Sequence, residues 1–192
     1  MNEKLKKQID FIIEIDKIKS IIRKTKLFDG SKYENDAEHS WHICMMAIIL
    51  QEYSNEKIDL LKVLKMLLIH DLVEIDAGDY LVYTDKNIEK NEKEKKAADR
   101  IFSILPDEQK SELTLLWKEF EEKETAEAKF AFALDRLEPV MQNYYNEGAT
   151  WKQHNIKYEK IVNINCKIED GSTELWQYAK NIIEEIKNSG VI

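Results

Sequence analysis

The 192-residue chain is poor in the residues that make turns, with two prolines and five glycines. A fold built from many strands needs many tight turns, so this scarcity argues against an all-β protein. Lysine, glutamate, isoleucine, leucine and alanine are abundant, and most of these favour helices. The composition therefore predicts a mainly helical protein.

Cysteines and long apolar runs are also scarce. Cys44 and Cys166 lie far apart and form no CxxC pair, so we expect buried thiols in a reducing cytoplasm. The longest apolar stretch, Ile43–Leu50, is far shorter than the roughly 20 residues that a membrane span needs. The N-terminal segment is too acidic, and its apolar run too short, for a signal peptide. We therefore expect a cytoplasmic protein with no membrane partner.

The sequence has no basic stripe, and its formal net charge is −8. Proteins that bind nucleic acid usually carry a basic surface, so no nucleic-acid partner is expected. A small-molecule ligand fits an acidic protein better. The chain contains no internal repeat and no low-complexity linker, which predicts a single domain over residues 1–192.

Apolar residues recur at helical spacing along most of the chain. An N-terminal amphipathic helix is expected to end near Arg23, and no strand pair is evident. The apolar side of this helix comprises Leu5, Ile9, Ile12, Ile13, Ile15 and Ile18. Further helices are expected from residue 35, over 59–75, 89–105 and 107–122, from residue 125, and over 158–168 and 173–187. The pattern predicts an all-α bundle of six to eight helices.

Three local signals refine these boundaries. Asn35 precedes Glu38 by three residues, which is the spacing of a helix capping box. Thr125 should cap a long helix, and Pro139 should kink that helix or end its first half. The apolar stripe of this long helix comprises Phe130, Leu134, Leu137 and Met141.

The most informative stretch is LLIHDLVEIDAGD, residues 67–79. An apolar run ends in His70-Asp71, and Glu74 lies four and three positions further on, so the three share one side of a helix. Neighbouring carboxylates in a dry place raise a pKa or require a cation. A divalent metal ion would relieve this repulsion, and histidine and aspartate are common ligands of such ions.

Two ligands do not complete a metal site, so the rest must come from other helices. His39 is in the first turn of its helix, and Asp135 lies at the shoulder of a buried stripe. Helical bundles commonly bind metals between such positions. A hydrogen-bonded couple would explain His70 and Asp71 equally well, and the spacing alone leaves both interpretations open.

The segments ENDAEHSWH, LLIHDLVEIDAGD and FALDRLEPV place a His, a His-Asp pair and a distant Asp in a fixed order. Together they resemble the HD superfamily of metal-dependent phosphohydrolases, in the bacterial branch close to the 5′-deoxynucleotidases. The resemblance covers about residues 18–186. It implies a single-domain helical bundle of the HD type, a homodimer, and hydrolysis of a small phosphate ester, most simply a (deoxy)nucleoside 5′-monophosphate.

The resemblance also implies roles for single residues. Glu74 matches a catalytic acid near the attacking water, and Asp79 matches a carboxylate beside the sugar and the leaving oxygen. Arg23 falls where the family keeps a phosphate-binding arginine. One divalent ion (Mn, Co, Mg, Ni, Fe or Zn, its identity left open) is expected. The positions that match its ligands are His39, His70, Asp71 and Asp135.

One departure from the family leaves the substrate open. Lys24 stands where the deoxynucleotidases have a tryptophan, which puts deoxyribose selectivity in doubt. A phosphatase for another small ester and a non-catalytic regulator that binds metal and nucleotide remain alternatives. Glu138 is interpreted as solvated or structural and Arg136 as a brace, while the roles of His42 and His154 stay open.

Overall fold

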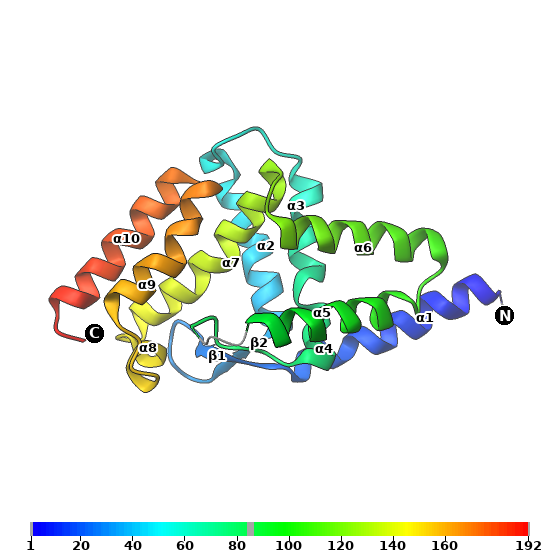
Figure 1. Cartoon of the computed structure of the whole chain (residues 1–192), viewed down its shortest axis with the longest axis horizontal. Helices are drawn as coiled ribbons and strands as arrows, with labels where there is room; N and C mark the ends of the chain where they lie inside the picture. Colours follow the sequence, from blue (N-terminus) through cyan, green and yellow to red (C-terminus); the bar gives the residue numbers. More distant parts are fainter. Residues whose placement is uncertain (1, 84–86, 192) are drawn as a thin grey trace.

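The protein folds mainly into helices, with one small antiparallel sheet (Figure 1). This computed structural model describes residues 2–83 and 87–191. Within those ranges, eight α-helices have eight residues or more and two are shorter, which confirms the predicted all-α class. The helices are α1 (Glu3–Ile15), α2 (Asp36–Leu50), α3 (Leu60–Ile69), α4 (Glu74–Ala77), α5 (Asn87–Phe102), α6 (Asp107–Glu122), α7 (Ala126–Tyr145), α8 (Ala149–Gln153), α9 (Tyr158–Asn165) and α10 (Thr173–Asn188).

Helix α7 runs through the middle of the molecule and carries the larger hydrophobic core (Figure 1). It packs against α2, α3, α6 and α10. In its predicted stripe, Phe130, Leu134 and Leu137 are at most 1% exposed, and Met141 is partly buried. The Thr125 side chain caps the helix, as the sequence predicted. Packing on several sides makes α7 a firm support for any side chain that it presents.

Pro139 does not end α7, because the helix continues through it to Tyr145. A proline has no N–H, so it leaves the carbonyl of Asp135 without its usual helical partner. The Asn143 side chain donates a hydrogen bond of 2.9 Å to the Pro139 carbonyl. Packing of α7 against its neighbours outweighs the local cost of the proline.

A second hydrophobic cluster lies beside the first, under α1, α5 and α6. Near the end of α3, residues that are close in sequence belong to different clusters. Met66 and Leu67 belong to the larger cluster, whereas Ile69 and Leu72 belong to the smaller one. The residues that follow α3 are thus placed at the boundary between the two clusters.

The sequence prediction missed a two-stranded sheet, β1 (Ile22–Lys26) and β2 (Tyr33–Asn35). The N-terminal helix ends at Ile15, well before Arg23, and Arg23 lies on β1. Strands of five and three residues are too short to show a clear alternation of apolar and polar side chains. The turn between them uses Gly30 at a φ of 70°. This hairpin carries Arg23 and its neighbours to the N-terminus of α2.

The predicted apolar face of α1 is largely exposed. Leu5, Ile9, Ile12 and Ile13 are each at least 43% exposed, and Phe11 is the residue of this helix that is buried. The helix projects to one end of the molecule, where it packs mainly against α5 (Figure 1). Too few elements surround α1 to cover all of its apolar side chains.

The expected helix over 59–75 is divided in the structure. Asp59 caps α3, which ends at Ile69, and a 3₁₀ helix, η3 (His70–Val73), leads into α4. Gly78 ends α4 with a φ of 78°, a conformation that glycine adopts readily. Because 3₁₀ geometry winds more tightly than an α-helix, it changes the directions in which the side chains of η3 point.

Two smaller expectations concern the membrane and the cysteines. Among the described residues, no helix has both the length and the apolar character that crossing a membrane requires. Cys44 and Cys166 are free thiols, but both are only partly buried, whereas the sequence led us to expect fully buried ones.

We predict that truncating a buried apolar side chain of α10 destabilises the protein, whereas truncating an exposed one of α1 does not. Ile183 in α10 is 0% exposed, whereas Ile13 in α1 is 66% exposed. Ile183→Ala should therefore lower the free energy of unfolding by about 2–5 kcal/mol, measured by urea denaturation. The matched Ile13→Ala change should stay within about 0.5 kcal/mol. A comparable loss at Ile13 would show that the apolar side of α1 is covered in solution.

Candidate metal centre and active site

The candidate site forms where the start of α2, the end of α3 and the middle of α7 converge. The predicted capping box at α2 is present, with Asn35 and Glu38 exchanging side-chain and backbone hydrogen bonds. This cap fixes the beginning of α2, where Asp36 and His39 are 0% exposed. The sequence signal for the helix start therefore also sets the position of a candidate ligand.

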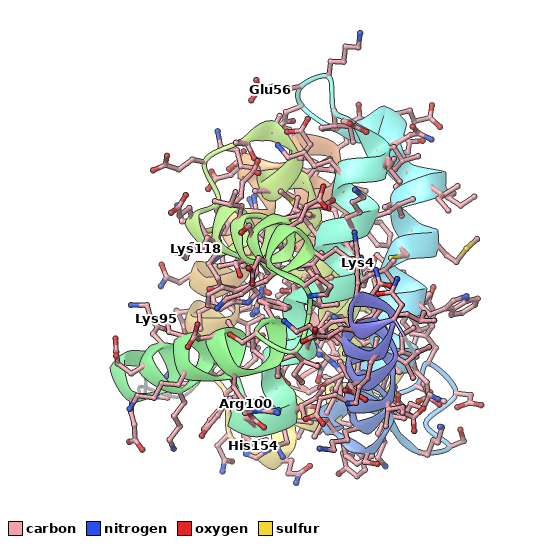
Figure 2. All side chains as sticks on the ribbon, turned by 90° about the vertical axis from the view of Figure 1, so that its right-hand side faces the viewer. Lys4, Glu56, Lys95, Arg100, Lys118 and His154 are labelled. Carbon is pink, nitrogen blue, oxygen red and sulfur yellow. The ribbon has the colours of Figure 1, made fainter. Side chains whose placement is uncertain are left out.

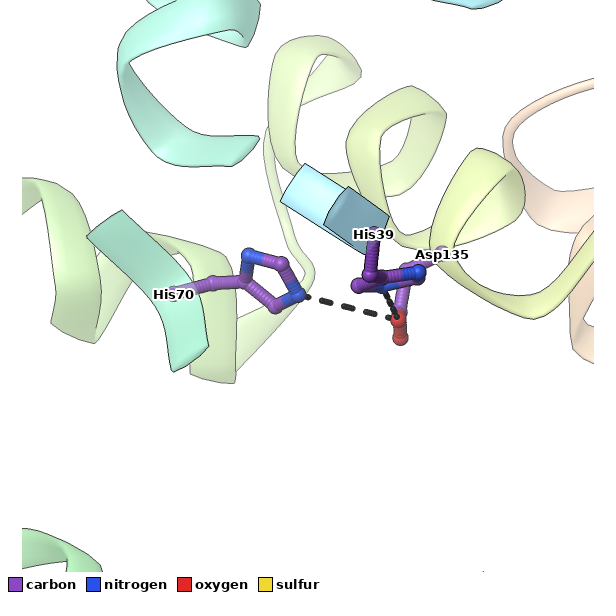
Figure 3. A group of neighbouring side chains, drawn as sticks. All are labelled: His39, His70 and Asp135. Carbon is purple, nitrogen blue, oxygen red and sulfur yellow. Dashed lines mark hydrogen bonds and ion pairs between the residues drawn. The ribbon is translucent and has the colours of Figure 1, made fainter. Parts of the chain in front are cut away.

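Three buried side chains from three segments face one point (Figure 3). His39 comes from α2, His70 from η3 and Asp135 from α7, and one ligand atom of each lies within 4.8 Å of the others. Asp135 Oδ1 is 3.1 Å from Nε2 of His39 and 3.7 Å from Nε2 of His70. The structure thus brings together three of the four residues that match the family's ligands.

Asp71, the fourth of these residues, lies at the edge of the group. Its Oδ2 is 3.1 Å from Nε2 of His70 and 3.8 Å from Nε2 of His39. The same oxygen accepts a hydrogen bond of 2.9 Å from Arg23. Asp71 is therefore near both imidazoles, although its closest contact is with a guanidinium.

Both imidazoles present the same ring nitrogen to the group. Nδ1 of His70 donates to the carbonyl of Leu67 at 2.9 Å, and Nδ1 of His39 donates to Glu138. Nε2 of each ring then faces Asp135, and Nε2 of His70 is buried without a hydrogen-bond partner. A buried imidazole nitrogen without a partner beside carboxylates fits a divalent cation, for which His and Asp are suitable ligands.

The carboxylates of the group favour the protonated form of the two imidazoles. Burial lowers the pKa of each ring, but the facing carboxylates outweigh it. Glu138 and Asp135 raise the pKa of His39 to about 9, and Asp71 and Asp135 raise that of His70 to about 10. A cation bound at this point would take the place of these protons.

A cavity of about 320 Å³ opens beside the group and is lined by Asp71, Glu74, Asp79 and Asp135. Glu74 is 5% exposed, and one oxygen each of Glu74 and Asp79 is buried without a hydrogen-bond partner. Burial and then Asp71 hold the pKa of Glu74 well above its ordinary value. Burial also raises the pKa of Asp79, against the effect of Arg23. Both predicted catalytic acids therefore lie in the cavity in a dry environment.

Arg23 lies among three carboxylates at the wall of this cavity. Its Nη1 donates to Asp71 at 2.9 Å and to Asp36 at 3.3 Å, and its Nε is 3.5 Å from Glu34. Burial lowers the pKa of the guanidinium, but the surrounding carboxylates raise it well above its ordinary value. Arg23 is therefore the cation that neutralises the acids behind the predicted ligand set.

The sequence interpretation missed three acids of this site. Glu34 and Asp36 are buried, and burial is the main cause that raises the pKa of each to about 7. Glu138 is 0% exposed and contacts His39 and His42, so of the two roles considered for it, solvated or structural, the contacts agree with the structural one. The available signal was the spacing of Glu138, three residues after Asp135 on one helix.

His154, whose role the sequence left open, lies away from the site. His154 follows α8, is exposed, and is not among the residues lining the cavity; Figure 2 shows it at the edge of the molecule. Tyr80 and Tyr83 both line the cavity. The Tyr83 hydroxyl accepts hydrogen bonds of 3.0 Å from Trp151 and Asn165, which anchors the segment after Asp79.

We predict that removing Arg23 destabilises the metal-free protein. Arg23→Met would leave buried carboxylates without their cation, so the free energy of unfolding should fall by about 3–5 kcal/mol in urea titrations at pH 8. The matched control is Arg100→Met. Arg100 is 44% exposed and pairs with Glu14 and Asp76, so its loss should cost about 0–1 kcal/mol. Equal effects of the two changes would contradict the buried ion cluster.

Comparison with known proteins gives the following relatives. The chain is 34% identical over 114 residues to the 5′-deoxynucleotidase HDDC2 of Xenopus laevis, which is 58% of this chain and 54% of that protein. It is 31% identical over 112 residues to the human 5′-deoxynucleotidase HDDC2, with 57% and 52% covered. The chain thus spans about half the length of the curated relatives that it matches.

Solved structures extend the comparison. A crystal structure of a "predicted metal-dependent phosphohydrolase" from Magnetospirillum magnetotacticum MS-1 superposes with a TM-score of 0.94 at 47% identity, over 98% of this chain and 95% of that one. An HD-domain phosphohydrolase from Listeria innocua, 14% identical with a TM-score of 0.59 over 93% of this chain and 89% of that one, shares the fold. The HD domain family profile matches residues 15–176. The chain therefore belongs to the HD domain family.

Proposed function

We propose that this protein is a metal-dependent phosphohydrolase that releases phosphate from a small nucleotide, most simply a (deoxy)nucleoside 5′-monophosphate. The observation that carries the proposal is the buried His39–His70–Asp135 group beside an acidic cavity. The relatives named 5′-deoxynucleotidase support a nucleotide substrate. The similar structure from Magnetospirillum magnetotacticum supports a metal-dependent reaction.

The proposed metal ligands are the four residues that match the family. His39 and His70 would bind through Nε2, since Nδ1 of each ring already has an acceptor. Asp135 and Asp71 would supply carboxylate oxygens. Bound there, a divalent ion lowers the pKa of water and offsets the charge of phosphate oxygens and neighbouring carboxylates.

In this proposal the water oxygen bonds to phosphorus, Glu74 accepts the water proton, and the phosphorus–oxygen bond to the nucleoside breaks. The positive charge of a divalent ion at the neighbouring ligands would lower the raised pKa of Glu74 and favour its proton-accepting form. The position of Glu74 in the cavity, one helical turn after Asp71, supports this role. The raised pKa of Asp79 keeps that residue able to donate a proton to the leaving alcohol. Arg23 orients Asp71 and offers its guanidinium to the phosphate at the cavity wall.

One residue favours a second candidate substrate. Lys24 lines the cavity and occupies the position at which the resembling deoxynucleotidases have a tryptophan. Its positive charge acts to lower the pKa of Asp79. A cation here favours a substrate with additional negative charge or hydroxyl groups. Another small phosphate ester is therefore the second candidate, and a non-catalytic regulator would be indicated by binding without turnover. The single domain over residues 1–192 and the homodimer stay predictions.

We predict phosphate release from nucleoside 5′-monophosphates when Mn²⁺, Co²⁺ or Mg²⁺ is supplied. A panel of nucleotides and sugar phosphates, assayed for free phosphate, should show the highest kcat/KM for a 5′-monophosphate. Glu74→Gln should lower kcat by about 10²–10⁴-fold because the proton acceptor is lost. Glu14→Gln, in an ion pair with Arg100 away from the cavity, should leave kcat unchanged. No release from any substrate of the panel would refute the proposal.

We also predict that activity depends on a removable ion. Dialysis against EDTA should abolish phosphate release, and added divalent ion should restore it. Asp135→Asn should weaken divalent-ion binding, measured by calorimetry, because an amide replaces a charged ligand. Full activity after complete removal of metal, confirmed by elemental analysis, would contradict the assignment of the ligands.

A further inference from the structure

Glu138 lies behind the predicted metal ligands and does not line the cavity. It is 0% exposed, and both of its carboxylate oxygens are engaged. Oε2 accepts from Nδ1 of His39, and Oε1 accepts from Nδ1 of His42. One buried carboxylate therefore connects two imidazoles of α2 that lie on the same side of that helix.

Helix α7 holds the His39 ring from both edges. Asp135 faces Nε2 at 3.1 Å, while Glu138, one turn further along the same helix, accepts from Nδ1. His70 is held differently, because its Nδ1 donates to the carbonyl of Leu67 on its own helix. The orientation of the His39 ring thus depends on the Glu138 side chain, and a single substitution of Glu138 can remove this contact.

This arrangement decides which nitrogen of His39 is available. A neutral imidazole has one N–H and one lone pair, and a carboxylate at Nδ1 keeps the N–H there. The lone pair is then on Nε2, which points to Asp135 and His70 (Figure 3). Acceptors that hold the second nitrogen of a ligand histidine typically affect metal affinity by 10–100-fold.

We propose that Glu138 is the positioning residue of the metal centre: it fixes His39 with Nε2 toward the ion, and His42 in turn fixes Glu138. This inference rests on the metal centre of the proposed function and assigns a role to two residues outside the cavity-lining set. Burial strengthens it, because a carboxylate that water cannot reach needs both donors.

A second metal ion is the competing interpretation of the same residues. Glu34, His42 and Glu138 offer ligand atoms within 4.8 Å of one another. However, Nδ1 of His42 and both oxygens of Glu138 already bond within the His39–Glu138–His42 chain. An ion here would have to break the contact that orients His39. The geometry therefore favours positioning, and the number of ions bound distinguishes the two.

The test is the binding of Co²⁺ to the full-length protein, followed by calorimetry and by visible absorption. Glu138→Gln should weaken binding by about 10–100-fold. The amide has one oxygen and cannot accept from both rings, and its NH₂ group, if turned toward Nδ1, favours the wrong tautomer. His42→Phe should weaken binding less, because Glu138 keeps its bond to His39. Glu14→Gln is the control for loss of a paired glutamate elsewhere and should bind as the native protein does.

The measurements need no substrate, so they separate this inference from the proposed reaction. One ion per native chain, with binding weakened in Glu138→Gln and thermal melting retained, supports the positioning role even if no phosphate is released. Affinity within twofold of native in Glu138→Gln overturns it. Two ions in the native protein and one in the variant also overturn it, in favour of a second site.

If Glu138→Gln fails to fold, the His42→Phe variant decides. Unchanged binding in His42→Phe together with two bound ions overturns the proposal, whereas weakened binding of a single ion supports it. No binding by the native protein ends both proposals.

Discussion

The site depends on the mutual neutralisation of charges that the fold has removed from water. Carboxylates from β2, α2, η3 and α7 lie within a few ångströms of one guanidinium and two imidazoles. An isolated buried charge would be strongly destabilising, so each acid is tolerable only beside its cation. Carboxylates outnumber the cations around the imidazoles, which supports the proposed binding of a dication there. The same balance of buried charges therefore affects both the binding of the proposed ion and the stability of the fold.

Local signals in the sequence were sufficient to predict much of this arrangement. The capping box at Asn35 located the start of α2, and the apolar stripe before His70 indicated α3, although the predicted helix ran on to residue 75 and α3 ends at Ile69. Such signals act within a few residues and depend on helix periodicity. The helical stripe also indicated Asp135 as a candidate, but only the family resemblance connected it to His39 across 96 positions.

The features that were missed depend on contacts between distant segments. The hairpin of β1 and β2 is too short to give a periodic signal, yet it decides that Arg23 meets Asp71 rather than ending a helix. The spacing of Glu138 from Asp135 placed the two on one side of a helix, but the burial of Glu138 follows from the packing of α7 on α2, a contact between distant segments. For α1 the periodicity correctly indicated a helix, but its apolar side is largely exposed. Amphipathic periodicity does not tell whether another element covers the apolar side.

The boundary between the two hydrophobic clusters has a mechanical consequence. α2 and α7 are built on the larger cluster, whereas η3 borders the smaller one through Leu72 and Val73. Helix α6 already joins the two clusters through Phe120 and Trp117, and an ion shared by His39, Asp135 and His70 would add a second connection between them. Loading the centre would then strengthen the cohesion between the two clusters, because an ion that binds only the folded chain stabilises it.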